Sequence, residues 1–157
     1  MRRAANEGTA RTNVVARTIQ RGHAHHQPAV DAIRNLEKAG HQLCLVPQVL
    51  YELWVILARP ISVNGPGYTV ENAHRELLDI QSLFVLLRDE RTIFEKWLIL
   101  VLQCATQGKQ AHDARLVAAM QRHSISPILT FHRGDFARFP GIVTLMPGEV
   151  TQDSPLP

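Results

Sequence analysis

Three acidic residues lie in stretches of sequence that are otherwise apolar. Asp113 stands at the start of the helical pattern "AHDARLVAAM", and steps of three, four and seven residues from it reach only apolar side chains. Glu52 has apolar residues one turn away on both sides in "VLYELWVIL", and Asp135 follows an apolar run in "LTFHRGDFARF". A carboxylate in such a place is costly unless it caps a helix, pairs with a cation or binds a metal ion.

Each acid taken alone has a simple structural interpretation. Asp113 is of a type favoured at helix N-caps, Glu52 could pair with Arg59 on its own helix, and Asp135 could serve a turn. Taken together, clustered carboxylates could instead hold Mg²⁺ or Mn²⁺ next to a phosphodiester, where the metal would activate a water molecule. The spacing alone leaves both interpretations open.

The elements that would position these acids alternate between helix and strand. The pattern predicts helices over 28–40, 47–59, 70–84 (capped by Thr69), 91–107 and 111–120, and strands over 42–46, 84–88, 127–131 and 142–146. Strands separated by helices predict an α/β fold, a small parallel sheet with helices on both faces. In such folds ligands bind at the carboxyl ends of the strands. Because each acid follows a strand or begins a helix, all three are expected there.

The composition is that of one soluble globular domain. The chain has 157 residues, of which 45% are hydrophobic and 20% charged, and its longest apolar runs, such as "WLILVL", are too short to span a bilayer. Cys44 and Cys104 show no paired spacing, so reduced thiols and a cytoplasmic location are expected. The net charge of +3 comes from the first 22 residues, which carry five arginines against one glutamate. Attraction to nucleic acid would therefore come mainly from this N-terminal arm.

Three segments, "VPQVLYELWVILARP", "GKQAHDARLVAAM" and "LTFHRGDFARFPGIVTL", resemble the motif segments of PIN-domain ribonucleases, especially the VapC-type toxins of bacterial toxin–antitoxin pairs. The resemblance runs from about residue 12 to residue 146. It implies a metal-dependent endoribonuclease with Mg²⁺ or Mn²⁺ as cofactor. It also implies an RNA substrate, an antitoxin-like protein partner, a homodimer and no membrane. The implied catalytic and metal-binding residues are Glu52, Asp113 and Asp135, supported by Asn13, Thr130 and His112, although His112 could equally be a surface histidine.

The sequence departs from the family pattern at its start. The family has an apolar strand ending in an Asp, and in "GTARTNVVAR" the position of that Asp is occupied by Arg11. The preceding "MRRAANEGTA" also lacks the aliphatic residues of a buried strand. Either the segment has diverged or the start of the reading frame is misassigned. We therefore expect a divergent or disordered arm over residues 1–10, a PIN-like domain over 11–147 and a disordered tail over 148–157.

Arg11 changes what the site could do. Four acids become three acids and one guanidinium, so the formal charge rises from −4 to −2. A guanidinium forks readily onto carboxylates, so Arg11 could pair with Glu52 or Asp113 and replace the metal. Two functions follow: a metal-dependent endoribonuclease weakened by Arg11, or a catalytically inactive PIN-fold module that binds RNA or an antitoxin-like protein. The loss of apolar residues from the first strand also predicts a domain that is marginally stable or dependent on a partner.

Overall fold

The chain folds around one sheet of five parallel strands, and the computed structural model describes residues 7–153. The strand order is β3-β2-β1-β4-β5, so the first strand lies at the centre. The strands are β1 (Glu7–Ala10), β2 (Gln42–Leu45), β3 (Val85–Leu86), β4 (Pro127–Leu129) and β5 (Val143–Leu145). The helices are α1 (Thr12–Ile19), α2 (His26–Lys38), α3 (Pro47–Leu57), α4 (Val70–Leu83), α5 (Arg91–Gln103) and α6 (Gln110–Arg122), with 3₁₀ turns η1 (Ile61–Val63), η2 (Arg133–Phe136) and η3 (Pro147–Glu149).

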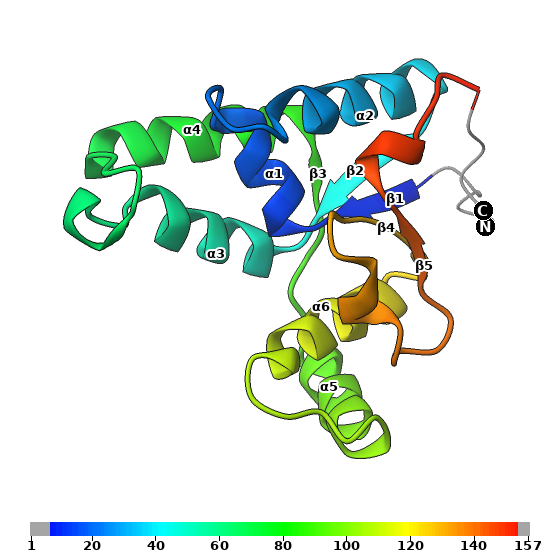
Figure 1. Cartoon of the computed structure of the whole chain (residues 1–157). Coiled ribbons are helices and arrows are strands. Elements are labelled where there is room, and N and C mark those ends of the chain that lie inside the picture. The colour runs from blue at the N-terminus through cyan, green and yellow to red at the C-terminus, as the bar shows by residue number, and fades with distance from the viewer. Residues whose placement is uncertain (1–6, 154–157) are drawn as a thin grey trace.

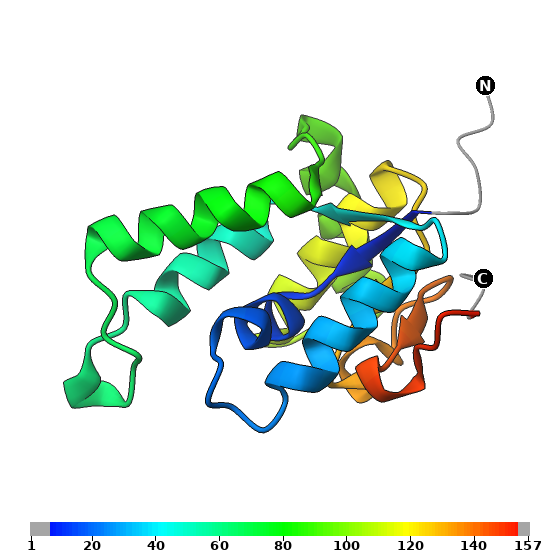
Figure 2. The ribbon, with the colours of Figure 1, turned by 90° about the horizontal axis from the view of Figure 1, so that it is seen from above.

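The helices cover both faces of this sheet. In Figures 1 and 2, α1 and α2 pack on one face and α6 on the other, with α5 outside α6. The pair α3 and α4 extends to one side of the sheet, as Figure 1 shows. The expected α/β architecture is thereby confirmed. Among the described helices, none is long and apolar enough to cross a membrane.

Local sequence explains where the helices begin and end. Pro47 opens α3, where its fixed φ fits and its missing N–H costs nothing. The Thr69 hydroxyl accepts a hydrogen bond from the backbone N–H of Asn72 and caps α4, as the sequence predicted. The buried face of α2, formed by Ala29, Ala32, Ile33 and Leu36, repeats at helical spacing.

The first strand corrects the expected N-terminal boundary. Residues 7–10 do not belong to an arm, because they form β1, which pairs with β2 on one side and β4 on the other. Gly8, Thr9 and Ala10 are all buried. The strand forms without large apolar side chains because backbone hydrogen bonds to two neighbours hold it. The remaining part of the predicted arm, residues 1–6, lies outside the described residues.

The C-terminal segment also packs further than expected. Residues 147–149 form η3, and Val150, only 7% exposed, joins the hydrophobic core. The side-chain amide of Asn35 on α2 donates to the Val150 carbonyl at 3.2 Å. The packed domain therefore reaches residue 150, not 147. Of the predicted tail, residues 154–157 lie outside the described residues.

Candidate functional site

The site lies where the central strand β1 ends next to β4. The backbone N–H of Arg11 donates to the Leu129 carbonyl at 3.0 Å, which continues the pairing of β1 with β4 by one residue. Arg11 is then the N-cap residue of α1, and its side chain makes no capping hydrogen bond. The strand order turns at β1, since β2 and β3 lie on one side and β4 and β5 on the other. Such a switch in strand order is where open α/β sheets bind ligands.

The Arg11 guanidinium bridges two of the predicted acids. Its Nη2 lies 2.7 Å from Asp113 Oδ1, and its Nη1 lies 2.5 Å from Asp135 Oδ2. The guanidinium carbon also lies 5.1 Å from the centre of the Phe136 ring, within the range of a cation–π contact. The side chains of Arg11 and Asp113 are only 18% and 14% exposed, whereas Asp135 is 43% exposed. We call Arg11, Asp113 and Asp135 the acid centre.

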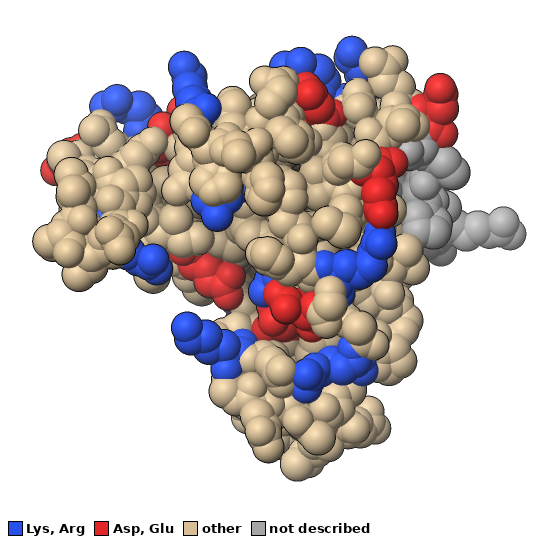
Figure 3. Space-filling model, in the orientation of Figure 1, with Lys and Arg blue, Asp and Glu red and all other residues tan. Residues whose placement is uncertain are grey.

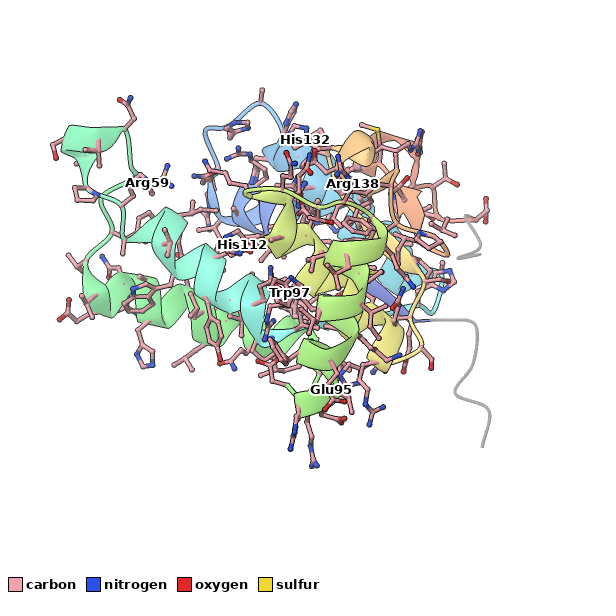
Figure 4. The ribbon with its side chains drawn as sticks, turned by 90° about the horizontal axis from the view of Figure 1, so that it is seen from below. Arg59, Glu95, Trp97, His112, His132 and Arg138 are labelled. Atoms are coloured by element: carbon pink, nitrogen blue, oxygen red, sulfur yellow. The ribbon has the colours of Figure 1, made fainter. Side chains whose placement is uncertain are left out.

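Asp113, the less exposed partner of Arg11, is carried by a well-anchored helix. Asp113 lies in the first turn of α6, whose following residues Leu116, Val117 and Met120 are buried. The Trp97 indole N–H on α5 donates to the Ala111 carbonyl at 2.8 Å, so the start of α6 is tied to α5; Figure 4 labels Trp97 at this junction. Asp113 thus faces inward, and the cation beside it is Arg11.

Glu52 lies near the acid centre but does not pair with Arg11, and neutral groups donate its hydrogen bonds. Its carboxylate accepts hydrogen bonds from the Thr12 hydroxyl at 2.5 Å and from Gln48 Nε2 at 2.9 Å. Gln48 Nε2 also donates to the His112 carbonyl at 2.8 Å, and Gln48 Oε1 accepts from Arg115 at 3.2 Å. Buried Gln48 therefore links α3 to α6. The predicted alternative, a Glu52–Arg59 pair, is absent from the ion pairs of the described residues.

The three predicted supporting residues differ in their contacts. Thr130 is fully buried just after β4, and its hydroxyl accepts from the backbone N–H of His132 at 3.1 Å. Asn13 Nδ2 lies 3.4 Å from the same hydroxyl, so Asn13 and Thr130 are together under the site. The His112 side chain is exposed, and the residue enters the network described above only through its backbone carbonyl. The surface interpretation of His112 therefore fits its position.

Burial dominates the electrostatics of Asp113. Desolvation raises the pKa of its carboxyl above the ordinary value of 3.8, and the Arg11 guanidinium opposes that rise. The nearby carboxylates of Asp135 and Glu52 raise the pKa further. Figure 3 shows this concentration of charge: acidic atoms gather in the middle of the face, between the part formed by α1–α4 and the part formed by α5 and α6, with basic atoms beside them.

The acids in this arrangement do not fit a divalent metal ion. Within residues 7–153, no group of three or more His, Cys, Asp and Glu side chains is placed to hold one. The physical reason is that the Arg11 guanidinium already lies between Asp113 and Asp135, while Glu52 is directed to Thr12 and Gln48. Mg²⁺ requires several oxygen ligands at short distances. Beside the fixed positive charge of Arg11 it would also be repelled.

Sequence reasoning missed three residues of this network. Thr12 and Gln48 hold Glu52, and Phe136 lies beneath Arg11. Gln48 precedes Glu52 by four residues, a spacing at which helical side chains meet, so this pair carried a readable signal. Thr12 matches the small hydroxyl residue of the family motif next to Arg11, and Phe136 follows Asp135, but their contacts with Glu52 and Arg11 depend on the packing of distant segments, which no local pattern marks.

Comparison with known proteins identifies the fold. No protein-family model matches the sequence, and no curated protein is significantly similar to it. Among solved structures, a chain of the VapBC2 complex from Rickettsia felis, bound to a DNA fragment from its promoter, superposes with a TM-score of 0.64 at 14% identity, covering 89% of this chain and 98% of that one. A chain of a toxin–antitoxin complex from Klebsiella pneumoniae superposes with a TM-score of 0.61 at 21% identity, covering 87% and 96%.

A third structure adds a toxin of stated activity. VapC20 of Mycobacterium tuberculosis, a toxin that cleaves the sarcin–ricin loop, superposes with a TM-score of 0.60 at 17% identity, covering 83% of this chain and 91% of that one. At these identities the agreement concerns the path of the chain and not its activity. The predicted resemblance is confirmed at that level: this chain has the PIN-like α/β fold of VapC-type toxins.

Proposed function

We propose that this chain is a PIN-type, RNA-directed protein in which endoribonuclease activity is suppressed by Arg11. The observation that carries the proposal is the two-point contact of the Arg11 guanidinium with Asp113 and Asp135. Both acids and Glu52 occupy the positions that the family resemblance implies for catalysis and for binding Mg²⁺ or Mn²⁺. The difference lies in the cation, which here belongs to the protein itself.

The chemistry of arginine explains why it would act as a lasting block. A guanidinium does not lose its proton in proteins, so no ordinary change of pH removes its charge. Its planar fork also satisfies two carboxylates at once, and these charge-assisted hydrogen bonds are strong. Unlike a bound divalent ion, it cannot lower the pKa of a coordinated water molecule. The charge of the acids is thus neutralised, but no water molecule is activated for hydrolysis.

The proposal is tested by restoring an acid at position 11. The native chain and Arg11→Asp are incubated with a structured RNA in Mn²⁺ or in EDTA, and their thermal unfolding is followed under both conditions. We expect the native chain to leave the RNA intact, and we expect Mn²⁺ not to change its melting temperature. Arg11→Asp should cleave RNA only with Mn²⁺ and be stabilised by the ion, by about 2.7 kcal/mol at a hundredfold excess over Kd.

Two further variants separate the explanations. Arg11→Asp combined with Asp113→Asn should lose both the cleavage and the Mn²⁺ stabilisation, because it removes a carboxylate from the restored set. Arg11→Leu should remain silent, because it removes the block without replacing the missing ligand. EDTA-sensitive cleavage by the native chain would contradict the proposal, since it would mean that the three acids work despite Arg11.

A second candidate function is a protein-binding module without catalysis, and the surface of α5 favours it. Phe94, Leu98 and Leu102 form a stripe at four-residue spacing and are 60%, 46% and 75% exposed. On α3, Tyr51 and Val55 are 65% and 59% exposed. Exposed apolar side chains at helical spacing are typical of protein interfaces. An antitoxin-like partner or a second copy of the chain is therefore also proposed.

Light scattering coupled to size-exclusion chromatography tests the second copy. If α5 forms a homodimer, the native chain should elute with twice the mass of the monomer, and Leu98→Lys should restore the monomer without loss of helical content. If the native chain is a monomer, the apolar stripe on α5 is proposed to bind a different protein.

A further inference from the structure

The strongest unassigned feature is a polar pocket beside the acid centre. It has a volume of about 490 Å³ and lies between α1 and α3, closed on one side by the loop that follows α3. Its basic lining residues besides Arg11 are Arg17 on α1 and Arg59 just after α3. We infer that this arginine pocket, meaning Arg17, Arg59 and the space between them, binds a backbone phosphate of single-stranded RNA. The inference rests on the proposed function, because it names how the RNA is held.

The charges of the pocket favour an anion. Within residues 7–153, neither Arg17 nor Arg59 has a carboxylate within ion-pair distance, and Arg17 donates only to the side-chain oxygen of Gln20. The acid that lines the pocket, Glu52, is already bonded to Thr12 and Gln48. Two guanidinium groups are therefore left with free donors, and a phosphate has the oxygen geometry that accepts hydrogen bonds from such donors.

The loop after α3 is built to hold Arg59 in place. The backbone N–H of Gly67 donates to the Arg59 carbonyl at 3.0 Å, and that of Gly65 donates to Pro60 at 2.9 Å. A Cβ at Gly65 would lie 2.0 Å from the Arg59 carbonyl oxygen, so only glycine permits this approach. The segment "VNGPG" takes no part in the acid centre. It fixes the backbone that carries Arg59.

The pocket is continuous with the acid centre. Arg11, Thr12 and Asn13 line its inner end, and His132 lines it from the segment after β4. In Figure 4, Arg59 lies beyond the end of α3, and His132 lies across from it. A strand of RNA with one phosphate on Arg17 and Arg59 would therefore pass directly next to the acids. The pocket would position the chain, while sequence would be read elsewhere.

The test measures RNA binding in EDTA, where no cleavage competes. A fluorescent single-stranded oligoribonucleotide is titrated with the native chain, Arg17→Gln, Arg59→Gln, Arg59→Lys and the control Arg34→Gln. Arg34 lies on α2 outside the pocket and is 58% exposed, so its loss removes the same charge elsewhere. We expect Arg17→Gln and Arg59→Gln each to weaken binding roughly three- to tenfold and to reduce the salt dependence by about one charge. Arg34→Gln should bind as the native chain does, and Arg59→Lys should keep most of the affinity.

The remaining outcomes distinguish the two proposals. If the native chain binds RNA and both Gln variants bind equally well, the pocket is wrong while the RNA-directed function stands. If neither the native chain nor Arg11→Asp binds RNA, both fail. A DNA oligonucleotide of the same sequence is the second probe, and the same variants should also bind this DNA more weakly than the native chain does. A loss confined to RNA would place the contacts on the 2′-hydroxyl and overturn the phosphate assignment.

Discussion

The acid centre, with one arginine, and the arginine pocket, with two, lie at the same edge of the sheet and differ in what surrounds their guanidinium groups. In the acid centre, Arg11 is mostly buried and shared between Asp113 and Asp135. In the arginine pocket, Arg17 and Arg59 line an open pocket and have no carboxylate partners in the described chain. The comparison teaches that the surroundings of an arginine decide its role. Where the fold supplies anions the guanidinium becomes structural, and where it supplies none the guanidinium can bind a ligand.

The largest expected effect is on stability, and it separates the two groups directly. Arg11→Leu should lower the free energy of unfolding by about 2 kcal/mol, because it leaves a poorly exposed Asp113 without its cation. The matched variant Arg59→Leu should change it by less than about 0.5 kcal/mol, because no ion pair is lost. Urea unfolding followed by circular dichroism measures both.

An equal loss of unfolding free energy in Arg11→Leu and Arg59→Leu would contradict the distinction between the acid centre and the arginine pocket. It would mean that the contacts of Arg11 contribute no more than those of a solvent-facing arginine. A gain in stability in Arg11→Leu would show that burying the guanidinium costs more than its pairing returns, as is known for some buried ion pairs.

Most of the fold was predictable because its signals are local. Gly40, Pro47 and Thr69 mark helix ends, and short apolar runs mark the strands. The central strand β1 was not predictable, since "EGTA" has one residue of high strand propensity, Thr9, and no large apolar residue. It forms because β2 and β4 pair with it on both sides. This pairing has a cost, because the buried Thr9 hydroxyl has no hydrogen-bond partner among residues 7–153.

The sequence indicated which residues would gather at the candidate site, but not how they would be connected, and their catalytic and metal-binding roles stay a prediction. Glu52, Asp113 and Asp135 stood out because they are acidic residues among apolar ones. Arg11 stood out because it departs from a family motif. Which acids would form ion pairs with Arg11 was not predictable. The prediction allowed Glu52 or Asp113, and the structure pairs Arg11 with Asp113 and Asp135. That choice depends on the packing of α6 and η2, separated from Arg11 by more than a hundred residues.

A smaller effect extends the comparison to an acid held without any arginine. Thr12→Val should lower the free energy of unfolding by about 1 kcal/mol, because the Glu52 carboxylate loses a short hydrogen bond from the Thr12 hydroxyl. The control is Thr18→Val on the same helix, because the Thr18 hydroxyl donates to the Val15 carbonyl one turn earlier in its own helix. It should cost a few tenths of a kcal/mol. Equal costs in urea unfolding would mean that water replaces the Thr12 contact without loss.

The smallest effect concerns pH, because burial and Arg11 act on Asp113 in opposite directions. Burial wins and raises the pKa of Asp113, so the folded chain holds this proton above pH 3.8, where the unfolded chain releases it. The free energy of unfolding should therefore fall as the pH rises from 3.8 to the raised pKa, and level off beyond it. Asp113→Asn has no such proton, so its stability relative to the native chain should increase across this interval.

Removing Arg11 turns the same measurement into a test of the acid centre. In Arg11→Leu the group that lowers the pKa of Asp113 is gone, so the pKa should rise further and the decline of stability should extend to higher pH. Arg59→Leu should leave the native profile unchanged, because Arg59 makes no contact with this carboxyl. Urea unfolding at a series of pH values records all four chains. A native chain that gains stability relative to Asp113→Asn as the pH rises would show instead that Arg11 outweighs burial and lowers the pKa of Asp113.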